Sequence, residues 1–342
     1  MTRRLLFVAA CVAICACGGG GDSGGGGVAT TYYVRVSGND ASDGLTAATA
    51  FSSIGRAALL AGRGDTVIVG PGFYSERQVG PSEGTSGSSG SPILFLADRD
   101  GTMTGDVPGD VVLSASGGSG FSLRRVEHVI IDGFVVEDAA GENAVGILVR
   151  SRSSDVTIRN CVIRNNLGDG IRVQSSSDVR IFNNLIHDNS RNGIRIAGDP
   201  GSSRAQIVNN TVVRNRQRGV FIGTADAAST EAFLRNNILQ FNESANLQVT
   251  LDPDSSRGLS SSFNVVFPER YSPRELDHSG DIIADALFVD AGNGDFHLLP
   301  ESPAVDAGAT DIDAELFADL LTRSTAPEEF ADVEPIDIGY HY

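Results

Sequence analysis

Two arginines and one aspartate are the residues of this sequence whose types and spacing best suit chemistry. Arg172 and Arg195 each stand in the middle of a triplet with an apolar residue on either side, and Asp169 precedes the first triplet. A guanidinium group binds a carboxylate through two parallel hydrogen bonds. Polymers of uronic acids carry one carboxylate on every sugar, so these residues predict a site for an acidic polysaccharide.

β-Elimination is the reaction that such a site could support, with Arg172, Arg195 and Asp169 as the catalytic candidates. The reaction needs a cation to neutralise the sugar carboxylate, a base to remove the neighbouring proton, and in some cases an acid for the leaving oxygen. The chain contains no lysine, so an arginine would have to be the base. Because an ordinary arginine is always protonated, this prediction requires a strongly perturbed guanidinium.

Four rows of similar sequence must position these side chains. The rows begin at Asn160, Asn184, Asn210 and Asn237, so their starts are 24, 26 and 27 residues apart. A nearly constant period of this size is typical of a solenoid. Each row holds short runs of Val and Ile that alternate with a period of two, which indicates strands with one buried face. We therefore predict an all-β fold, a right-handed parallel β-helix, in which the row-opening asparagines stack at one turn.

Stacking of the rows also predicts which side chains become neighbours. The middle residue of each triplet points outward, and equivalent strands lie about 4.8 Å apart. We expect one exposed column that consists of Leu148, Arg172, Arg195, Phe221 and Gln248. The candidate substrate-binding residues of the column and its adjoining turns are Arg150, Arg191, Asn192, Arg218, Phe221 and Gln248. The alternative is that the two arginines are simply solvated, since outward strand residues are usually polar.

Residues 1–17 have the features of a targeting segment. Arg3 and Arg4 precede an apolar run at 5–16, which is too short for a permanent membrane span. The end of the run, ICAC, resembles the bacterial lipoprotein signal, with Cys17 as the lipidated residue. The Gly-rich stretch 18–30 is typical of a flexible tether. We expect an exported, membrane-anchored lipoprotein of the periplasm, outer membrane or cell surface; the alternative is an ordinary secretory signal.

The remaining residues, 31–342, are predicted to form a single β-helix domain and a monomer. A short helix at 51–61 should cap the first coil within 31–76. The central coils are expected at 93–267, and the C-terminal coils and cap at 281–342, with a helix at 313–321 and a last strand at 336–338. A solenoid needs such caps because its terminal coils would otherwise expose open edges.

Composition excludes some partners and bonds. The net charge of the whole chain is −17, so nucleic acid is not an expected partner, because phosphate binding requires a basic patch. Cys161 is the one cysteine beyond the targeting segment, which excludes an intrachain disulfide in the domain. We expect its side chain to point inward as a small apolar group.

Both ends of the domain resemble a known family. The sequence YYVRVSGNDASDGLTAATAFSSIGRA, followed by GDTVIVGPGFYSE, spans 32–76 and resembles the opening of bacterial β-helix proteins related to polysaccharide lyases, notably the family-nine pectate lyases. The segment DALFVDAGNGDFHLLPESPAVDAGATDID, with the final DIGYHY, is similar to the C-terminal part of many such exported proteins. The resemblance implies a polysaccharide partner, and Ca²⁺ as a cofactor held by several aspartates, with a lysine as the base.

This chain departs from that pattern at the implied site. It has no lysine, and Asp169 is the single acid at the turn where the family gathers its aspartates, so Asp169 is only a weak candidate for a metal ligand. Two functions are therefore predicted. One is a polysaccharide lyase that acts on a uronate polymer; the other is a non-catalytic protein of the cell envelope that binds glycan or protein through the same face.

Other titratable residues offer weaker hypotheses. His187 and Asp188 lie within one row, and we favour a buried, hydrogen-bonded histidine at a place equivalent to Ile163 and Val213. A hydrolase would need two carboxylates on either side of one bond. Asn192 stands where a partner for Asp169 would be, and the acids that precede this region are Glu137, Asp138 and Glu142.

Overall fold

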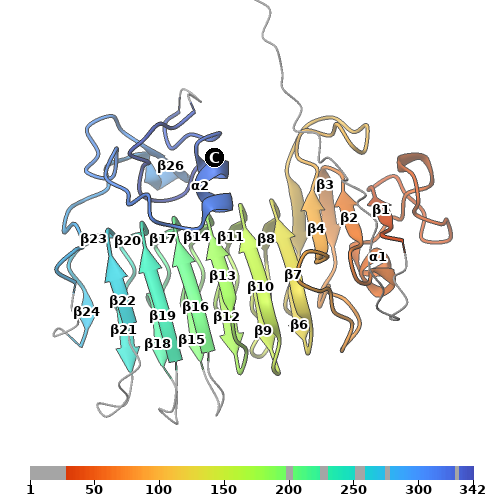
Figure 1. Cartoon of the computed structure of the whole chain (residues 1–342), viewed down its shortest axis with the longest axis horizontal. Helices are drawn as coiled ribbons and strands as arrows, with labels where there is room; N and C mark the ends of the chain where they lie inside the picture. Colours follow the sequence, from red (N-terminus) through yellow and green to blue (C-terminus); the bar gives the residue numbers. More distant parts are fainter. Residues whose placement is uncertain (1–27, 198–202, 224–229, 251–258, 274–277, 328–330) are drawn as a thin grey trace, which may run out of the picture.

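The computed structural model of this chain describes residues 28–197, 203–223, 230–250, 259–273, 278–327 and 331–342. Short parallel strands wind into coils, and each coil passes through three sheets in turn (Figure 1). No helix in these described ranges is long and apolar enough to cross a membrane.

The first two sheets form two of the three sides of the coils. The first sheet contains β1 (Thr31–Val34), β2 (Thr66–Val69), β4 (Ile93–Ala97), β7 (Glu127–Asp132), β10 (Ser154–Arg159), β13 (Val179–Phe182), β16 (Ser203–Val208), β19 (Thr230–Arg235) and β22 (Leu259–Ser262). The second contains β3 (Gly72–Ser75), β5 (Val111–Ser114), β8 (Val135–Glu137), β11 (Val162–Arg164), β14 (Leu185–His187), β17 (Thr211–Val213), β20 (Ile238–Gln240) and β23 (Val265–Phe267).

The third sheet carries the triplets that the sequence singles out. It contains β6 (Phe121–Arg124), β9 (Ile147–Arg150), β12 (Ile171–Gln174), β15 (Ile194–Ala197), β18 (Arg218–Gly223), β21 (Ala245–Thr250) and β24 (Tyr271–Ser272). All of its pairings are parallel, as the row periodicity predicts.

The core lies inside the coils, where every second side chain of a strand points inward. Ile171 and Val173 of β12 are almost fully buried, as are their equivalents in β15 and β18. Each such side chain contributes roughly 1.5–3 kcal/mol of apolar burial. Near the N-terminal end the filling is aromatic, and Phe121 contacts Phe95 and Phe134 edge to face, with ring centroids 5.8 and 5.2 Å apart.

One turn of the coil is built on a ladder of buried asparagines. In the ladder of Asn184, Asn210, Asn237 and Asn264, each side-chain amide donates to the next Oδ1 over 2.9–3.0 Å. The prediction that Asn160 opens this ladder is wrong. Asn160 lies one position earlier and donates to Asp132, while Cys161 takes the ladder position and its backbone N–H donates to Asn184 Oδ1.

Cys161 can stand in the ladder because its thiol is small and points inward, as predicted. The residue is completely buried, and burial raises the pKa of the Cys161 thiol to about 12.

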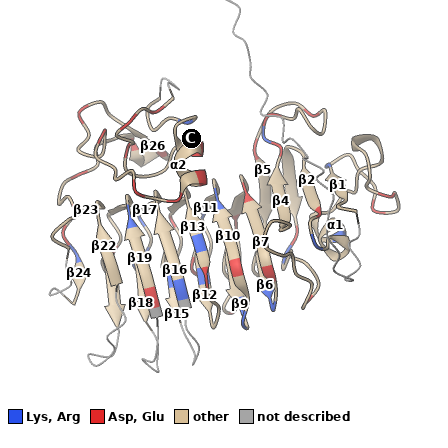
Figure 2. Ribbon diagram, viewed as in Figure 1, with Lys and Arg blue, Asp and Glu red and all other residues tan. Residues whose placement is uncertain are grey.

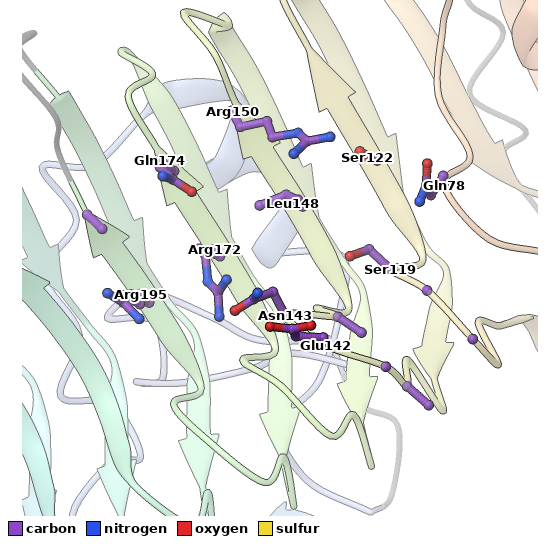
Figure 3. A pocket seen from close by; sticks show the side chains of 16 residues that line it. Gln78, Ser119, Ser122, Glu142, Asn143, Leu148, Arg150, Arg172, Gln174 and Arg195 are labelled. Atoms are coloured by element: carbon purple, nitrogen blue, oxygen red, sulfur yellow. The ribbon is translucent and has the colours of Figure 1, made fainter.

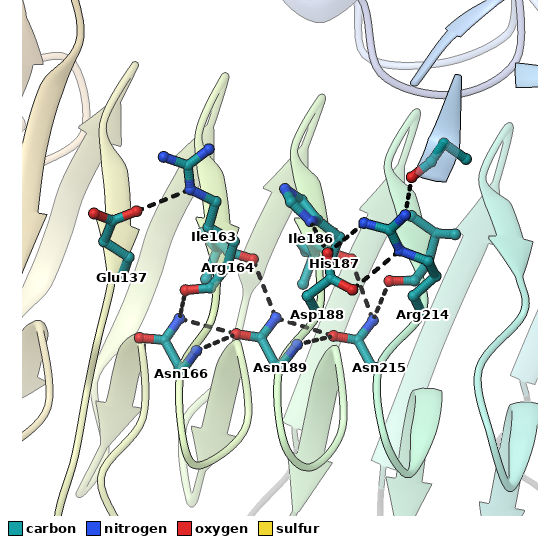
Figure 4. A network of polar contacts seen from close by, with 12 residues as sticks. Glu137, Ile163, Arg164, Asn166, Ile186, His187, Asp188, Asn189, Arg214 and Asn215 are labelled. Carbon is teal, nitrogen blue, oxygen red and sulfur yellow. Dashed lines mark hydrogen bonds and ion pairs between the residues drawn. The ribbon is translucent and has the colours of Figure 1, made fainter. Parts of the chain in front are cut away.

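A second ladder holds the turn that leads into the third sheet. It runs through Asn166, Asn189, Asn215 and Asn242, with amide-to-oxygen distances of 2.9–3.0 Å. Figure 4 shows its first three members. Each Oδ1 also accepts the backbone N–H of the preceding asparagine in the ladder. These bonds satisfy polar groups that the turn would otherwise bury without partners.

The N-terminal end is closed by α1 (Ile54–Leu60), within the predicted helix at 51–61. The helix starts later than predicted because the Ser53 hydroxyl accepts the Arg56 N–H and caps it. Ile54, Ala57 and Ala58 are buried against the first coil. A 3₁₀ turn, η1 (Ala47–Thr49), precedes the helix.

The C-terminal segment 286–342 lies along the side of the coils (Figure 1). It contains β25 (Phe288–Asp290), η2 (Ala291–Asn293), β26 (Asp295–Leu298) and α2 (Ala314–Leu320). β25 and β26 pair antiparallel, whereas the strands of the coils pair in parallel. The helix predicted at 313–321 is present, but the strand predicted at 336–338 is not, since Ile336 and Ile338 are buried as side-packing residues instead.

Candidate functional site

A groove of about 610 Å³ lies on the outer face of the third sheet (Figure 3). Its floor is made by outward residues of β9, β12 and β15, namely Leu148, Arg150, Arg172, Gln174, Arg195 and Ala197. Its walls come from the turn at 117–119 and the insertion at 140–144, with Gln78 and Ser122 beside them.

The predicted column exists in the described strands. Leu148 pairs in register with Arg172, Arg172 with Arg195, Arg195 with Phe221, and Phe221 with Gln248. This follows from the parallel ladder, because residues that occupy the same place in successive coils must lie side by side.

Arg172 is held by a carboxylate that solvent does not reach. Asp169 has no exposed surface, and its Oδ2 accepts the Arg172 Nε–H over 2.6 Å. Its Oδ1 accepts both the side-chain amide and the backbone N–H of Asn192, over 2.7 and 3.1 Å. Asp169 therefore uses both oxygens within the protein, and acts on the groove only by orienting Arg172.

The prediction of an exposed face is wrong at Arg172, which is only 8% exposed. The insertion that carries Glu142 and Asn143 lies beside its guanidinium and lines the same groove (Figure 3). The wall is fixed to the coil beneath, because Asn166 Oδ1 accepts the Ala139 N–H over 2.9 Å. A Cβ at Gly168 would lie 1.7 Å from the Ala144 carbonyl oxygen, so this close approach requires glycine.

Arg195 is partly exposed and is not neutralised by a partner. In the described parts of the chain no carboxylate lies within ion-pair distance of its guanidinium, and its Nε is buried without an acceptor. Burial lowers the pKa of Arg195, and repulsion from Arg172, Arg191 and Arg218 adds to this, while attraction to Asp169 opposes it. This is the direction that the base of an elimination would require.

The other predicted binding residues are divided between groove, support and surface. Arg150 lines the groove, and its buried Nε also has no acceptor. Arg218 donates to Gln248 and Asn192, and its guanidinium lies 4.8 Å from the centroid of the Phe221 ring. Arg191 is exposed and lies outside the residues that line the groove. Arginines and acidic residues both lie on strands of the coils, and further acidic residues lie in the C-terminal segment (Figure 2).

Several lining residues are not among the predicted site residues. Gln174 lies two positions after Arg172 and could have been found by the period of two. Ser119, Ser122 and Gln78 come from coils before the rows begin, and no repeat in the sequence marks them. Among the three acids that precede the region of Asp169, Glu142 is the one that lines the groove, and no repeat in the sequence distinguishes it from Glu137 and Asp138.

The groove residues do not fit Ca²⁺. This ion takes six to eight oxygen ligands, and both oxygens of Asp169 already bond within the protein. Glu142 is the other acid near the groove, which also holds three arginines. A separate acidic group, Asp306, Asp332 and Asp337, lies in the C-terminal segment, where it bonds to neighbouring side chains and backbone.

His187 is a buried histidine of the second sheet, as favoured from the sequence. Its Nδ1 lies 2.7 Å from Asp188 Oδ2 (Figure 4). The centroid of its ring lies 4.9 Å from that of Phe296. Burial lowers the pKa of His187, against the opposing effect of Asp188. Its neighbours in register are Arg164 and Val213, so the predicted equivalence to Val213 is confirmed and that to Ile163 is wrong.

Comparison with known proteins agrees with this architecture. Residues 109–257 match a family model described as a right handed beta helix region. The crystal structure of pectate lyase Pel9A superposes with a TM-score of 0.55 at 16% identity, over 92% of this chain and 96% of that one. A comparison with curated protein sequences finds no match.

Two further solved structures are similar over part of this chain. A rhamnogalacturonan lyase has a TM-score of 0.46 at 14% identity, over 69% of this chain and 74% of its own. The alginate lyase AlyGC has a TM-score of 0.49 at 16% identity, over 69% of this chain and 32% of its own. The family match and the likeness to pectate lyase Pel9A show that the fold is a right-handed parallel β-helix of the pectate lyase type, as the sequence predicts.

Proposed function

We propose that this right-handed β-helix protein binds a uronate-bearing polysaccharide in the groove of its third sheet. The observation that supports it best is the state of Arg150, Arg172 and Arg195. Each has a buried N–H group without an acceptor, and all three line one groove of an otherwise acidic protein. A desolvated cationic donor is costly unless it is paired. The carboxylates of a uronan would supply acceptors to this groove and, for Arg150 and Arg195, the opposite charge that Arg172 already has in Asp169.

The fold likeness to pectate lyase Pel9A adds to this proposal without fixing the chemistry, because one fold serves many functions. β-Elimination is the second candidate, and the lowered pKa of Arg195 favours it. In that reaction Arg195 would take the proton from C5, the electron pair would form the C4–C5 double bond, and the C4–O bond would break. The leaving oxygen would take a proton from water, and Arg172 would face the substrate carboxylate.

Binding and cleavage are separated by one set of measurements. Calorimetry on polygalacturonate, alginate, a glycosaminoglycan and a neutral glucan should show affinity for an acidic polymer only. Arg195→Gln should weaken it by about tenfold to a hundredfold, since a charge-assisted hydrogen bond contributes roughly 1.5–3 kcal/mol. Ultraviolet absorbance of an unsaturated product reports cleavage in the same samples.

The control for this prediction is Arg180→Gln. Arg180 lies on β13 of the first sheet and, like Arg195, is partly exposed; its Nη2 lies 3.8 Å from Asp155 Oδ1. The Arg180→Gln substitution should leave the affinity for the acidic polymer unchanged. Absence of binding to all acidic polymers would sink the proposal, whereas binding without an absorbance change would leave glycan binding and remove the lyase.

We also propose that the protein is an exported lipoprotein, which the sequence around Cys17 supports; residues 1–27 lie outside those that the structure describes. Mass spectrometry of the mature N-terminal peptide should find Cys17 lipidated, and most of the protein should sediment with membranes. Cys17→Ser should move it to the soluble fraction. A Cys15→Ser variant serves as the control and should stay with the membranes. Recovery of the wild-type protein without lipid would overturn the assignment.

A further inference from the structure

Arg172 and Arg195 look alike in sequence but differ in their surroundings. Arg172 is tied to Asp169 at 2.6 Å, so its charge is already balanced. Arg195 has no such partner among the described residues, and its guanidinium lies 5.6 Å from the centroid of the Phe221 ring. Arg195 therefore presents a positive charge to the groove that no carboxylate balances. The Phe221 ring lies beside it instead.

Phe221 contacts a second guanidinium as well. Arg218 lies 4.8 Å from the same ring centroid. The end of the ring lies over β18, since a Cβ at Gly223 would come within 2.8 Å of Phe221 Cζ. The ring thus contacts two guanidinium groups, and its end lies against its own strand. This leaves it badly placed to stack on a sugar, which is the role that a substrate-binding assignment would give it.

Arg218 is itself held in place. Its Nε donates to Gln248 Oε1, and its Nη1 lies 3.5 Å from Asn192 Oδ1. Asn192 is buried and bonds to Asp169. A continuous series of contacts therefore links the buried carboxylate beneath Arg172 to the ring beside Arg195.

We propose that Phe221 is a positioning residue that holds the Arg195 guanidinium toward the groove without neutralising it. The negative face of an aromatic ring attracts a cation, but it does not take the in-plane N–H bonds that a carboxylate would occupy. The Nη donors of Arg195, unlike its buried Nε, remain available for an acidic ligand. This inference rests on the proposed function, because it assigns a role to Phe221 in binding the uronate polymer.

A double-mutant cycle in uronate oligomer binding tests this role. Phe221→Leu should weaken the affinity by about tenfold. Phe221→Tyr keeps the ring, so the affinity of that variant should stay within about twofold of the wild-type value. In the Arg195→Gln background, Phe221→Leu should cost nothing further, because the ring would act only through that arginine. If the loss persists undiminished in that background, the ring contacts the sugar itself and the inference is wrong.

The matched control is Phe263→Leu. Arg235 lies 4.9 Å from the centroid of the Phe263 ring, so the same kind of contact is removed outside the groove, and the affinity should not change. An equal loss in this variant would mean that Phe221→Leu acts through general destabilisation, which would also overturn the inference.

A measurement without glycan keeps this inference separate from the proposed function. The NMR signal of the Arg195 Nε–H, assigned by its loss in Arg195→Gln, should shift in Phe221→Leu and stay near its wild-type position in Phe221→Tyr. If no acidic polymer binds the wild-type protein, the proposed function fails. If the signal is unchanged in Phe221→Leu, the ring does not position Arg195, whatever the protein binds.

Discussion

Replacing Asp169 with alanine should lower the free energy of unfolding by about 3–5 kcal/mol, the usual cost of leaving one partner of a buried ion pair alone. The carboxylate has no exposed surface, and Arg172 is only 8% exposed. Its removal leaves the guanidinium of Arg172 and the amide of Asn192 without their acceptor. Urea denaturation followed by circular dichroism measures the change, and the affinity for a uronate oligomer should fall with it.

A second variant distinguishes loss of the pair from loss of the charge. Asp169→Leu combined with Arg172→Met removes both partners, and should recover much of the stability because no charge stays buried alone. It should not recover glycan affinity. Glu83→Ala is the control, since it breaks exposed pairs with Arg124 and Arg125 and should cost less than about 1 kcal/mol. An Asp169→Ala cost as small as this control would show that the buried pair does not stabilise the coil.

The second large effect is expected at Asn189, in the middle of the ladder at the turn before the third sheet. Its Oδ1 accepts the backbone N–H and the side-chain amide of Asn166, and its own amide donates to Asn215 and to the Ile163 carbonyl. Asn189→Ala leaves several of these buried groups unpaired, at about 1–3 kcal/mol for each group. We expect a loss of at least about 3 kcal/mol in the same urea experiment.

Asn39→Ala is the matched control for the ladder. Asn39 makes a local bond in an exposed turn, where its Oδ1 accepts the Ala41 N–H over 3.0 Å, so its replacement should change stability by no more than about 0.5 kcal/mol. A similar small change for both variants would contradict the idea that the buried ladder holds the coils together.

Much of the fold could be predicted from the sequence, because in a parallel coil the repeat period and the strand register express the same regularity. Once the repeat period is known, the position of each triplet predicts which residues of the next coil lie beside Arg172 and Arg195. The offset of one residue at Asn160 could not be read in this way. Cys161 fills a ladder place by size rather than by chemical similarity, so the row appeared to begin one residue too early.

The site was predictable in its composition but not in its electrostatic balance. The sequence places Asp169 near Arg172, yet the burial of that pair depends on a wall insertion whose path no repeat determines. The partnership of Arg195 with Phe221 follows from register, whereas the orientation of the ring depends on the absence of a side chain at Gly223. The C-terminal segment was mistaken for further coils because short strands look alike whether they add to a coil or lie beside it.

The path of the C-terminal segment has a consequence for how the molecule comes apart. Asn183, Asn209 and Asn236 belong to three successive coils, and they bond to His341, Asp337 and Ala309 of this segment. A stack of coils would normally fray from its open end one winding at a time. Here the C-terminal segment that follows the last coil is bonded across three earlier ones. Unravelling from that end must therefore first detach the segment, and the coils should resist proteases until that step occurs.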